Sequence, residues 1–233
     1  MPRAANKAAP RGRPVRRLAE AVETRGLILD HAEALFARHG LHGVTVREVG
    51  SSAGVDPALV HYYFETKKGL FDAVFERRAE VLNAERISSM DAYALAAGER
   101  ISAEGCIEAF LEPILRHSIQ GDERWKNYFR LLALVNNSPD WGGRMMTRHF
   151  DPVIRRLIDL LRRCMPQASD VDLYWCYHFL SGALTLSLSE TGRIDRLSAG
   201  ACVSADMEAI LRRMVPFIAA GFRRVCQPGP QAT

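Results

Sequence analysis

The sequence predicts an all-α protein with a small N-terminal head of three helices and a larger helical body. Helix caps and helix-ending glycines follow one another between residues 24 and 75. Beyond residue 100, apolar residues recur at helical spacing, with no strand-like alternation. The chain has 233 residues, 48% of them hydrophobic and 25% charged, which is enough for one large or two modest domains. We therefore expect an arm over residues 1–20, a head over residues 21–75 and a body over residues 76–233.

The N-terminal arm is predicted to be disordered, because residues 1–20 carry three prolines and few apolar side chains. Within it, Arg11 and Arg13 belong to an Arg-Gly-Arg-Pro sequence that is similar to the core of an AT-hook. Such an arm lays its arginines in the minor groove of A·T-rich DNA. Four residues make a short motif, so a plain flexible tail remains the alternative.

The first helix is expected from Thr24 to His39, with Gly40 at its end. Its apolar residues recur at helical spacing and form one face, which comprises Ile28, Ala32, Leu35 and Phe36. This face would support two shorter helices that follow a loop over residues 41–44.

The two shorter helices are marked by their caps. Thr45 and Glu48 have the spacing of a capping box, so a helix should begin at Val46 and end at Gly54. Asp56-Pro57 then supplies an N-cap and a first-turn proline for a second helix. Two short helices joined by a glycine-containing turn form the helix-turn-helix pattern, whose second helix enters a DNA major groove.

The segment from Thr45 to Lys67 resembles the DNA-binding domain of the TetR family of bacterial transcriptional regulators. The resemblance covers about residues 24 to 75. It rests on Ala32, Leu35, Phe36, Gly40, Thr45, Arg47, Val49, Ala53, Gly54, Val55, Val60, Tyr63, Phe64, Lys67 and Leu70. The chain departs from the family at Gly50, Leu59 and His61, where Ala, a small polar residue and Tyr are frequent. The last two positions lie on the reading helix, so they bear on the operator sequence and not on the fold.

Helical spacing predicts that Val60 and Phe64 point toward the core and that Tyr63 points partly toward it. The residues left for the groove are Pro57, Ala58, Leu59, His61 and Tyr62. Apolar side chains among them can contact thymine methyl groups, and the polar ones can reach phosphates or base edges. Thr45 and Arg47 are placed to hold a phosphate. The resemblance implies phosphate contacts from Tyr63 and Lys67 as well.

The net positive charge is confined to the N-terminal part of the chain. Residues 1–70 hold 11 Lys and Arg against 7 Asp and Glu, whereas residues 71–233 hold 20 of each, so the net charge of +4 belongs to the head and arm. This asymmetry is typical of a protein that contacts phosphates with one end.

The body is expected to follow a connecting helix from Leu70 to about Ser88. The segment from Met90 to Glu104 is rich in Ala and Gly and is predicted to be a break. Further helices are predicted at about 104–119, 125–137, 143–163, 170–191 and 205–225, with Gly192 to Ser204 as a break between the last two.

The last two predicted helices carry apolar stripes. In the family that the head resembles, the matching pair forms a four-helix bundle with a second subunit. We assign this dimer interface to Leu173, Tyr177, Leu184, Leu188, Leu211, Met214, Ile218 and Phe222. The core of a monomer would have the same spacing. A dimer is favoured because one short recognition helix buries little surface, and a two-fold dimer matches a palindromic DNA site.

Large apolar and aromatic residues gather in the middle of the chain. The resemblance implies a small-molecule pocket there, whose occupation releases DNA. We expect it to be lined by Phe110, Ile114, Phe129, Leu132, Trp141, Met145, Arg148, Trp175, His178 and Phe179. An ordinary protein core would account for most of these residues equally well. The stretch from Leu132 to Phe150 resembles regulators that answer to fatty acids or acyl-CoA, so the expected effector is a small apolar molecule.

The remaining patterns argue against other classes of protein. The sequence contains no nucleophile motif, phosphate loop, metal-binding motif or cofactor motif, so we expect no enzyme, no metal and no cofactor. No apolar stretch approaches the ~20 residues of a membrane helix. The five cysteines are scattered and fit reduced thiols of the cytoplasm better than disulfides or zinc. A helical protein-interaction module is the alternative function, although it would leave the charge asymmetry and the caps unexplained.

Overall fold

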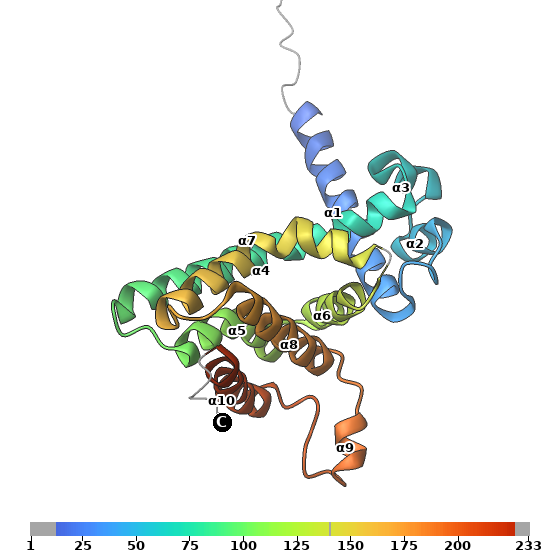
Figure 1. Ribbon diagram of the computed structural model, residues 1–233. Helices are drawn as coiled ribbons and strands as arrows, with labels where there is room; N and C mark the ends of the chain where they lie inside the picture. Colours follow the sequence, from blue (N-terminus) through green and yellow to red (C-terminus); the bar gives the residue numbers. More distant parts are fainter. Residues whose placement is uncertain (1–12, 140, 227–233) are drawn as a thin grey trace, which may run out of the picture. The chain divides into compact units, whose positions relative to one another are not determined.

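The computed structural model describes residues 13–139 and 141–226, and every regular element within these ranges is a helix (Figure 1). The expected all-α fold is thus confirmed. The described residues form two compact units, and the chain passes from the first to the second between Val74 and Phe75. None of the helices in these ranges combines the length and the apolar character needed to cross a lipid bilayer.

The head unit contains α1 (Arg13–His39), α2 (Val46–Ala53), α3 (Pro57–Phe64) and the first turns of α4 (Lys67–Ala97). Its core combines residues from all four helices, including Phe36, Val49, Val60 and Phe71, each at most 1% exposed. The rings of Phe36 and Phe71 meet edge to face, with centroids 5.0 Å apart. The apolar face predicted for α1 therefore supports the two short helices as expected.

The first helix begins earlier than the sequence analysis predicted. It starts at Arg13 and not at Thr24, so residues 13–20, which we expected to be disordered, are helical. Ala, Leu, Glu and Arg make up most of the added turns, and these residues have high helix propensity. Arg11 and the rest of residues 1–12 lie outside the described residues, as does the side chain of Arg13.

The break predicted at Met90 is wrong, because α4 continues to Ala97 and ends at Gly98, whose φ is +57°. Alanines favour helix, and the added turns bury Met90 and Ala94 in the body. A second difference lies between residues 192 and 204, where the expected break contains the five-residue helix α9 (Arg193–Leu197).

The body unit combines the rest of α4 with α5 (Ala103–Gln120), α6 (Glu123–Asn136), α7 (Gly142–Cys164), α8 (Asp170–Leu188) and α10 (Met207–Cys226). In this unit α10 packs against α5 and α8, while α7 packs against α5 and α6. Phe75 of α4 contacts the rings of Tyr128 and Phe150, with centroids 5.6 Å and 6.0 Å away. These contacts make one continuous apolar core from α4 to α7.

Candidate nucleic-acid interface and effector cavity

Helix α2 and the turn after it have the predicted local structure. Glu48 N–H donates to Thr45 Oγ1 over 3.2 Å, and Thr45 N–H donates to Glu48 Oε2 over 2.7 Å, which completes the capping box. The Thr45 hydroxyl also donates to Glu48 Oε2 over 2.8 Å, and this bond, together with that from the Thr45 N–H, lowers the pKa of the Glu48 carboxyl. Gly54 then ends the helix with a φ of +67°, a conformation that favours glycine. Hydrogen bonds between residues close in the sequence thus define the ends of α2 and the turn that follows it.

Helix α3 is held at both ends. Asp56 Oδ1 accepts a hydrogen bond of 2.7 Å from the Ala58 N–H, and Pro57 occupies the first turn. At its C-terminal end, Glu65 N–H donates to the His61 carbonyl over 2.8 Å. The Arg25 guanidinium of α1 lies 5.2 Å from the centroid of the Phe64 ring. These contacts hold α3 as a short rigid rod on the head.

The predicted DNA-contacting residues of α2, α3 and α4 lie on the surface of the head. Val60 and Phe64 are buried and Tyr63 is half-buried, as the helical spacing predicted. Tyr62 is 79% exposed, which is unusual for an aromatic side chain, and its ring meets that of Tyr63 edge to face with centroids 5.3 Å apart. The others are exposed or half-buried, namely Thr45, Arg47, Pro57, Ala58, Leu59, His61 and Lys67.

His61 has a defined donor arrangement. Its Nδ1 lies 3.1 Å from the Glu65 carbonyl oxygen. A carbonyl oxygen only accepts, so Nδ1 carries the proton, and in the neutral form of the ring Nε2 is then a hydrogen-bond acceptor. In this tautomer His61 adds a hydrogen-bond acceptor to the exposed surface of α3.

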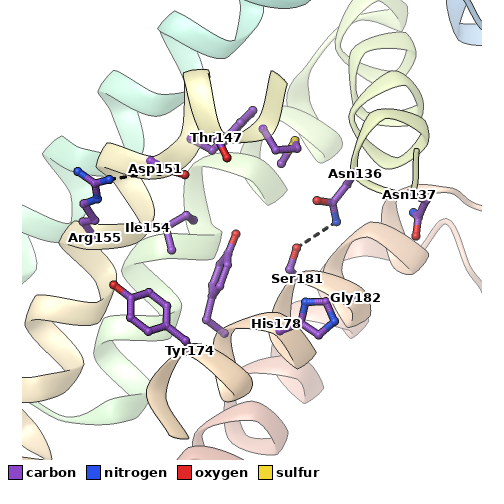
Figure 2. Close-up of a pocket in the computed structure, with 13 residues that line it drawn as sticks. Asn136, Asn137, Thr147, Asp151, Ile154, Arg155, Tyr174, His178, Ser181 and Gly182 are labelled. Carbon is purple, nitrogen blue, oxygen red and sulfur yellow. Dashed lines mark hydrogen bonds and ion pairs between the residues drawn. The ribbon is translucent and has the colours of Figure 1, made fainter. Parts of the chain in front are cut away.

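The body contains a cavity of about 500 Å³ between the end of α6, the first half of α7 and the middle of α8 (Figure 2). Four of its lining residues are apolar or glycine, namely Met146, Phe150, Ile154 and Gly182. The others bear hydrogen-bonding groups, namely Asn136, Asn137, Thr147, Asp151, Arg155, Tyr174, Tyr177, His178 and Ser181. The volume lies in the range of small-molecule sites.

Several polar groups of the cavity are already oriented by neighbours. Asn136 Nδ2 donates to Ser181 Oγ over 3.1 Å, and Arg155 Nη2 donates to Asp151 Oδ2 over 3.3 Å (Figure 2). Burial raises the pKa of the Tyr177 hydroxyl, while the nearby charge of Arg86 opposes this shift. Tyr177 therefore stays a neutral hydrogen-bonding group at physiological pH.

Family models match both parts of the chain. Residues 28–74 match the model described as bacterial regulatory proteins of the tetR family, and residues 108–221 match the tetracyclin repressor-like C-terminal domain. The chain belongs to the TetR family of DNA-binding transcriptional regulators. The matched head covers α2, α3 and the turn whose geometry is described above.

Curated relatives match the chain over limited stretches. BetI of Rhizobium meliloti, an HTH-type transcriptional regulator, is 34% identical over 90 residues, which is 39% of this chain and 40% of that protein. AcrR of Shigella flexneri, also an HTH-type transcriptional regulator, is 37% identical over 57 residues, which is 24% of this chain and 26% of that protein. The chain thus spans about a quarter to two fifths of the length of these relatives.

Solved structures extend the similarity of the fold to most of the chain. The fatty acid degradation regulator FadR from Bacillus halodurans superposes with a TM-score of 0.61 at 15% identity and covers 86% of this chain and 96% of its own. A TetR-like transcriptional regulator from Rhodococcus sp. RHA1 superposes with a TM-score of 0.57 at 16% identity and covers 86% of this chain and 94% of its own. At these identities the likeness establishes the TetR fold alone.

Of the ten residues predicted to line an effector pocket, His178 alone is among the residues that line the described cavity. Five are buried in the core of the body, namely Phe110, Ile114, Phe129, Leu132 and Met145. Trp175 and Phe179 are 55% and 59% exposed, Arg148 is exposed and Trp141 is half-buried. Large apolar residues are expected in any core, so composition could not separate a pocket from packing.

The structure also revises the predicted dimer interface of this TetR protein. Six of its residues are buried inside the protomer, namely Leu173, Leu184, Leu188, Met214, Ile218 and Phe222, and Tyr177 and Leu211 are half-buried. The exposed apolar residues belong to the other stripe of α8 and to α10, namely Val171, Trp175, Phe179, Leu186, Phe217 and Val225. We call these six residues the apolar face.

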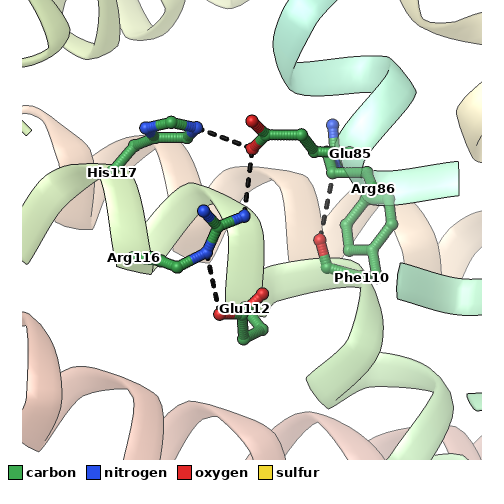
Figure 3. A network of polar contacts seen from close by, with 6 residues as sticks. All are labelled: Glu85, Arg86, Phe110, Glu112, Arg116 and His117. Carbon is green, nitrogen blue, oxygen red and sulfur yellow. Dashed lines mark hydrogen bonds and ion pairs between the residues drawn. The ribbon is translucent and has the colours of Figure 1, made fainter. Parts of the chain in front are cut away.

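A polar network connects α4 with α5 (Figure 3). Glu85 Oε2 accepts from His117 Nε2 over 2.6 Å and from Arg116 Nη2 over 3.1 Å. Arg86 is buried, with its Nε 3.2 Å from the Phe110 carbonyl and its guanidinium 3.8 Å from the centroid of the Phe110 ring. Burial lowers the pKa of Arg86 to about 10, which leaves it charged at physiological pH. This network tethers two helices and contains no nucleophile with a base.

Proposed function

We propose that this TetR-family protein is a repressor that binds a palindromic operator as a homodimer and releases it when a small molecule occupies the body. The observation that carries the proposal is the exposed polar and aromatic face of α3, a helix capped at both ends and mounted on a buried core. A rod of this kind fits the major groove of DNA.

Each predicted DNA-contacting residue from Thr45 to Lys67 has a proposed role. Tyr62 and His61 would contact base edges or phosphates, and Ala58 and Leu59 would contact thymine methyl groups. Pro57 would keep the N-terminal end of α3 close to the groove. The side chains proposed to hold phosphates on either side of the groove are Thr45, Arg47, Tyr63 and Lys67. Lys67 is the first residue of α4, so the charge of Lys67 adds to the positive N-terminal end of that helix. This end of the helix is held by a hydrogen bond of 2.9 Å from Gly69 N–H to Thr66 Oγ1.

The apolar face supports the proposed dimer. Trp175 and Phe179 stack with ring centroids 5.9 Å apart, and both rings face solvent. Beside them, Leu186 of α8 and Phe217 of α10 line a groove of about 760 Å³ together with residues of the segment 191–206. Two copies related by a two-fold axis would bury these side chains against each other, as an isologous interface requires.

The effector proposed here differs from the apolar molecule expected from the sequence. The cavity between α6, α7 and α8 offers amide, hydroxyl, carboxylate, guanidinium and imidazole groups beside a few apolar side chains. Its chemistry fits a compact molecule with several hydrogen-bonding groups better than an acyl chain. Occupation of the cavity would change the spacing of α7 and α8, and α8 carries the apolar face of the dimer.

Selection of bound sequences from a random duplex library tests the proposal. We expect enrichment of an inverted repeat, and a steep loss of affinity with rising salt because phosphate contacts release counterions. Retention of generic duplexes without enrichment, or no binding at low salt, would favour a helical protein-interaction module instead. Operator gel shifts with polar metabolites, fatty acids and acyl-CoAs then identify the effector class.

Matched variants locate the contacts. Tyr62→Ala should weaken operator binding, and the expected loss for a base or stacking contact is about 1–3 kcal/mol. The control is His42→Ala, which removes an exposed ring of the head from the loop before α2. Equal losses for both variants, or no loss for either, would contradict the role proposed for α3.

A further inference from the structure

Four of the five cysteines, far apart in the sequence, come together at one end of the body. Cys106 lies in the first turn of α5, Cys164 ends α7, Cys176 lies in the second turn of α8 and Cys226 ends α10. We call these four residues the thiol cluster. The sequence analysis expected scattered thiols. Spacing along the chain does not show which cysteines meet, because the packing of the helices decides this.

Ion pairs hold the same helix ends together. Arg223 near the end of α10 pairs with Glu104 at the start of α5. Arg162 near the end of α7 pairs with Asp170 at the start of α8 over 2.7 Å. These contacts come from residues next to the thiol cluster. The end of α7 is also held close to the start of α5, because Arg163 Nη2 donates to the Gly98 carbonyl over 3.2 Å.

The cluster consists of two pairs. The side chains of Cys106 and Cys164 lie next to each other, and so do those of Cys176 and Cys226. Cys226 also lies close enough to Cys164 for an electrostatic interaction between the two side chains. No set of three or more Cys, His, Asp or Glu in residues 13–139 and 141–226 converges as metal ligands do. The arrangement therefore suits chemistry between two sulfurs and not the binding of zinc.

The two pairs differ in access and in acidity. Cys164 is half-buried, whereas the other three thiols are buried. The hydrogen bond from Cys106 lowers the pKa of Cys164 and raises that of Cys106, and Arg156 and Arg163 add positive charge close to this pair. Burial raises the pKa of Cys176, and it raises that of Cys226 to about 12. We therefore assign the reactive thiolate to Cys164.

We propose that Cys106 and Cys164 form an oxidation site, which a hydroperoxide converts into an intramolecular disulfide between α5 and α7 while Cys176 and Cys226 remain thiols. This site is independent of DNA binding and of the effector cavity. Nothing in the family likeness of the head implies it.

The reaction has two balanced steps. The Cys164 thiolate attacks the terminal oxygen of the hydroperoxide, the O–O bond breaks, and the alkoxide or hydroxide leaves and takes up a proton. Cys164 is then a sulfenic acid. The Cys106 thiol, already in contact, attacks this sulfur and water leaves with the transferred proton. Two thiols are oxidised, one hydroperoxide is reduced, and Cys106 never needs to reach the solvent.

The test uses the full chain with Cys202→Ser, which removes the exposed fifth thiol. After treatment with one equivalent of hydrogen peroxide, we expect one disulfide that joins the Cys106 and Cys164 peptides and is reversed by dithiothreitol. Trypsin alone leaves Cys164 and Cys176 in one peptide, so a second cleavage before Asp170 is needed to separate them. Alkylation of the reduced protein should be at least about tenfold faster at Cys164 than at Cys176 or Cys226.

Two variants complete the design. Cys106→Ala should let the sulfenic acid at Cys164 persist long enough to be trapped by a cyclic dione. Cys176→Ala is the matched control and should leave the rate of disulfide formation unchanged. The disulfide is mapped in the Cys202→Ser protein, so this test does not depend on whether the Cys106→Ala and Cys176→Ala variants fold. A disulfide between Cys176 and Cys226 instead, or four thiols that resist peroxide until the protein unfolds, would overturn the proposal.

Discussion

The N-cap of α3 allows a sharp test, because its contribution can be separated from its charge. Asp56 Oδ1 accepts one hydrogen bond of 2.7 Å from the Ala58 N–H, and α3 is only eight residues long. Replacement of an N-cap residue by Ala costs about 1 kcal/mol, within a range of about 0.5–2. Asn caps a helix about as well as Asp does, so Asp56→Asn removes the charge and keeps the hydrogen bond.

The two variants should therefore separate in stability. A loss of about 1 kcal/mol lowers the melting temperature of a unit of 60–100 residues by roughly 4–8 °C. We expect this loss for Asp56→Ala and little change for Asp56→Asn. Thermal unfolding should be followed by a probe confined to the head, such as amide exchange in α3, because two compact units need not melt together.

Operator affinity should follow the same order. Both substitutions remove a negative charge beside the proposed DNA surface, which strengthens binding equally in each. If the lost cap allows α3 to fray, Asp56→Ala should bind up to about fivefold more weakly than Asp56→Asn. Variants that agree in both melting temperature and affinity would refute the argument that this cap holds α3 in its binding conformation.

Three further predictions concern the dimer, the capping box and the core. Phe179→Asp should convert a dimer to monomers in sedimentation experiments, since a buried aromatic anchor contributes about 2–4 kcal/mol. Leu95→Asp, at an apolar residue of α4 that is 87% exposed, is its control, and dissociation by both variants or by neither would argue against the apolar face. The lowered pKa of Glu48 contributes stability above the ordinary value of 4.5, which is lost as pH falls through the folded value. Glu48→Gln should therefore reduce the loss of the head's stability as the pH falls into the acidic range. A loss equal to that of the unsubstituted protein would contradict this. Phe110→Ala should reduce the free energy of unfolding of the body by about 3–5 kcal/mol in denaturant titrations, whereas a loss below about 1 kcal/mol would mean that Phe110 lines a cavity.

Local chemistry made the head predictable. The caps at Thr45 and Asp56 and the stop at Gly54 act within four residues of where they stand, and the structure has all three. The inward positions of Val60 and Phe64 follow from helical spacing alone. The resemblance to the TetR family rested on these same residues, so its signal was strongest where the physical argument was strongest.

The body was harder to predict for an identifiable reason. Periodicity finds the apolar stripes of α8, yet it cannot say which stripe another helix of the same chain covers. The stripe with Leu173 and Leu184 is buried in the protomer, while the stripe with Trp175 and Phe179 faces solvent. The break predicted at Met90 failed for the same reason, because burial of Met90 in the body extends a helix that composition alone left undecided.

By itself, the sequence determined the all-α class, the capped turn between α2 and α3 and the side of α3 that stays exposed. Hydrogen bonds between near neighbours and the spacing of apolar residues set these features, so a short window of residues contains the information. The tertiary structure alone decided the lining of the cavity, the apolar face and the meeting of four cysteines from four helices. These features depend on contacts between residues dozens of positions apart, and a one-dimensional pattern does not record which helix surfaces pack together.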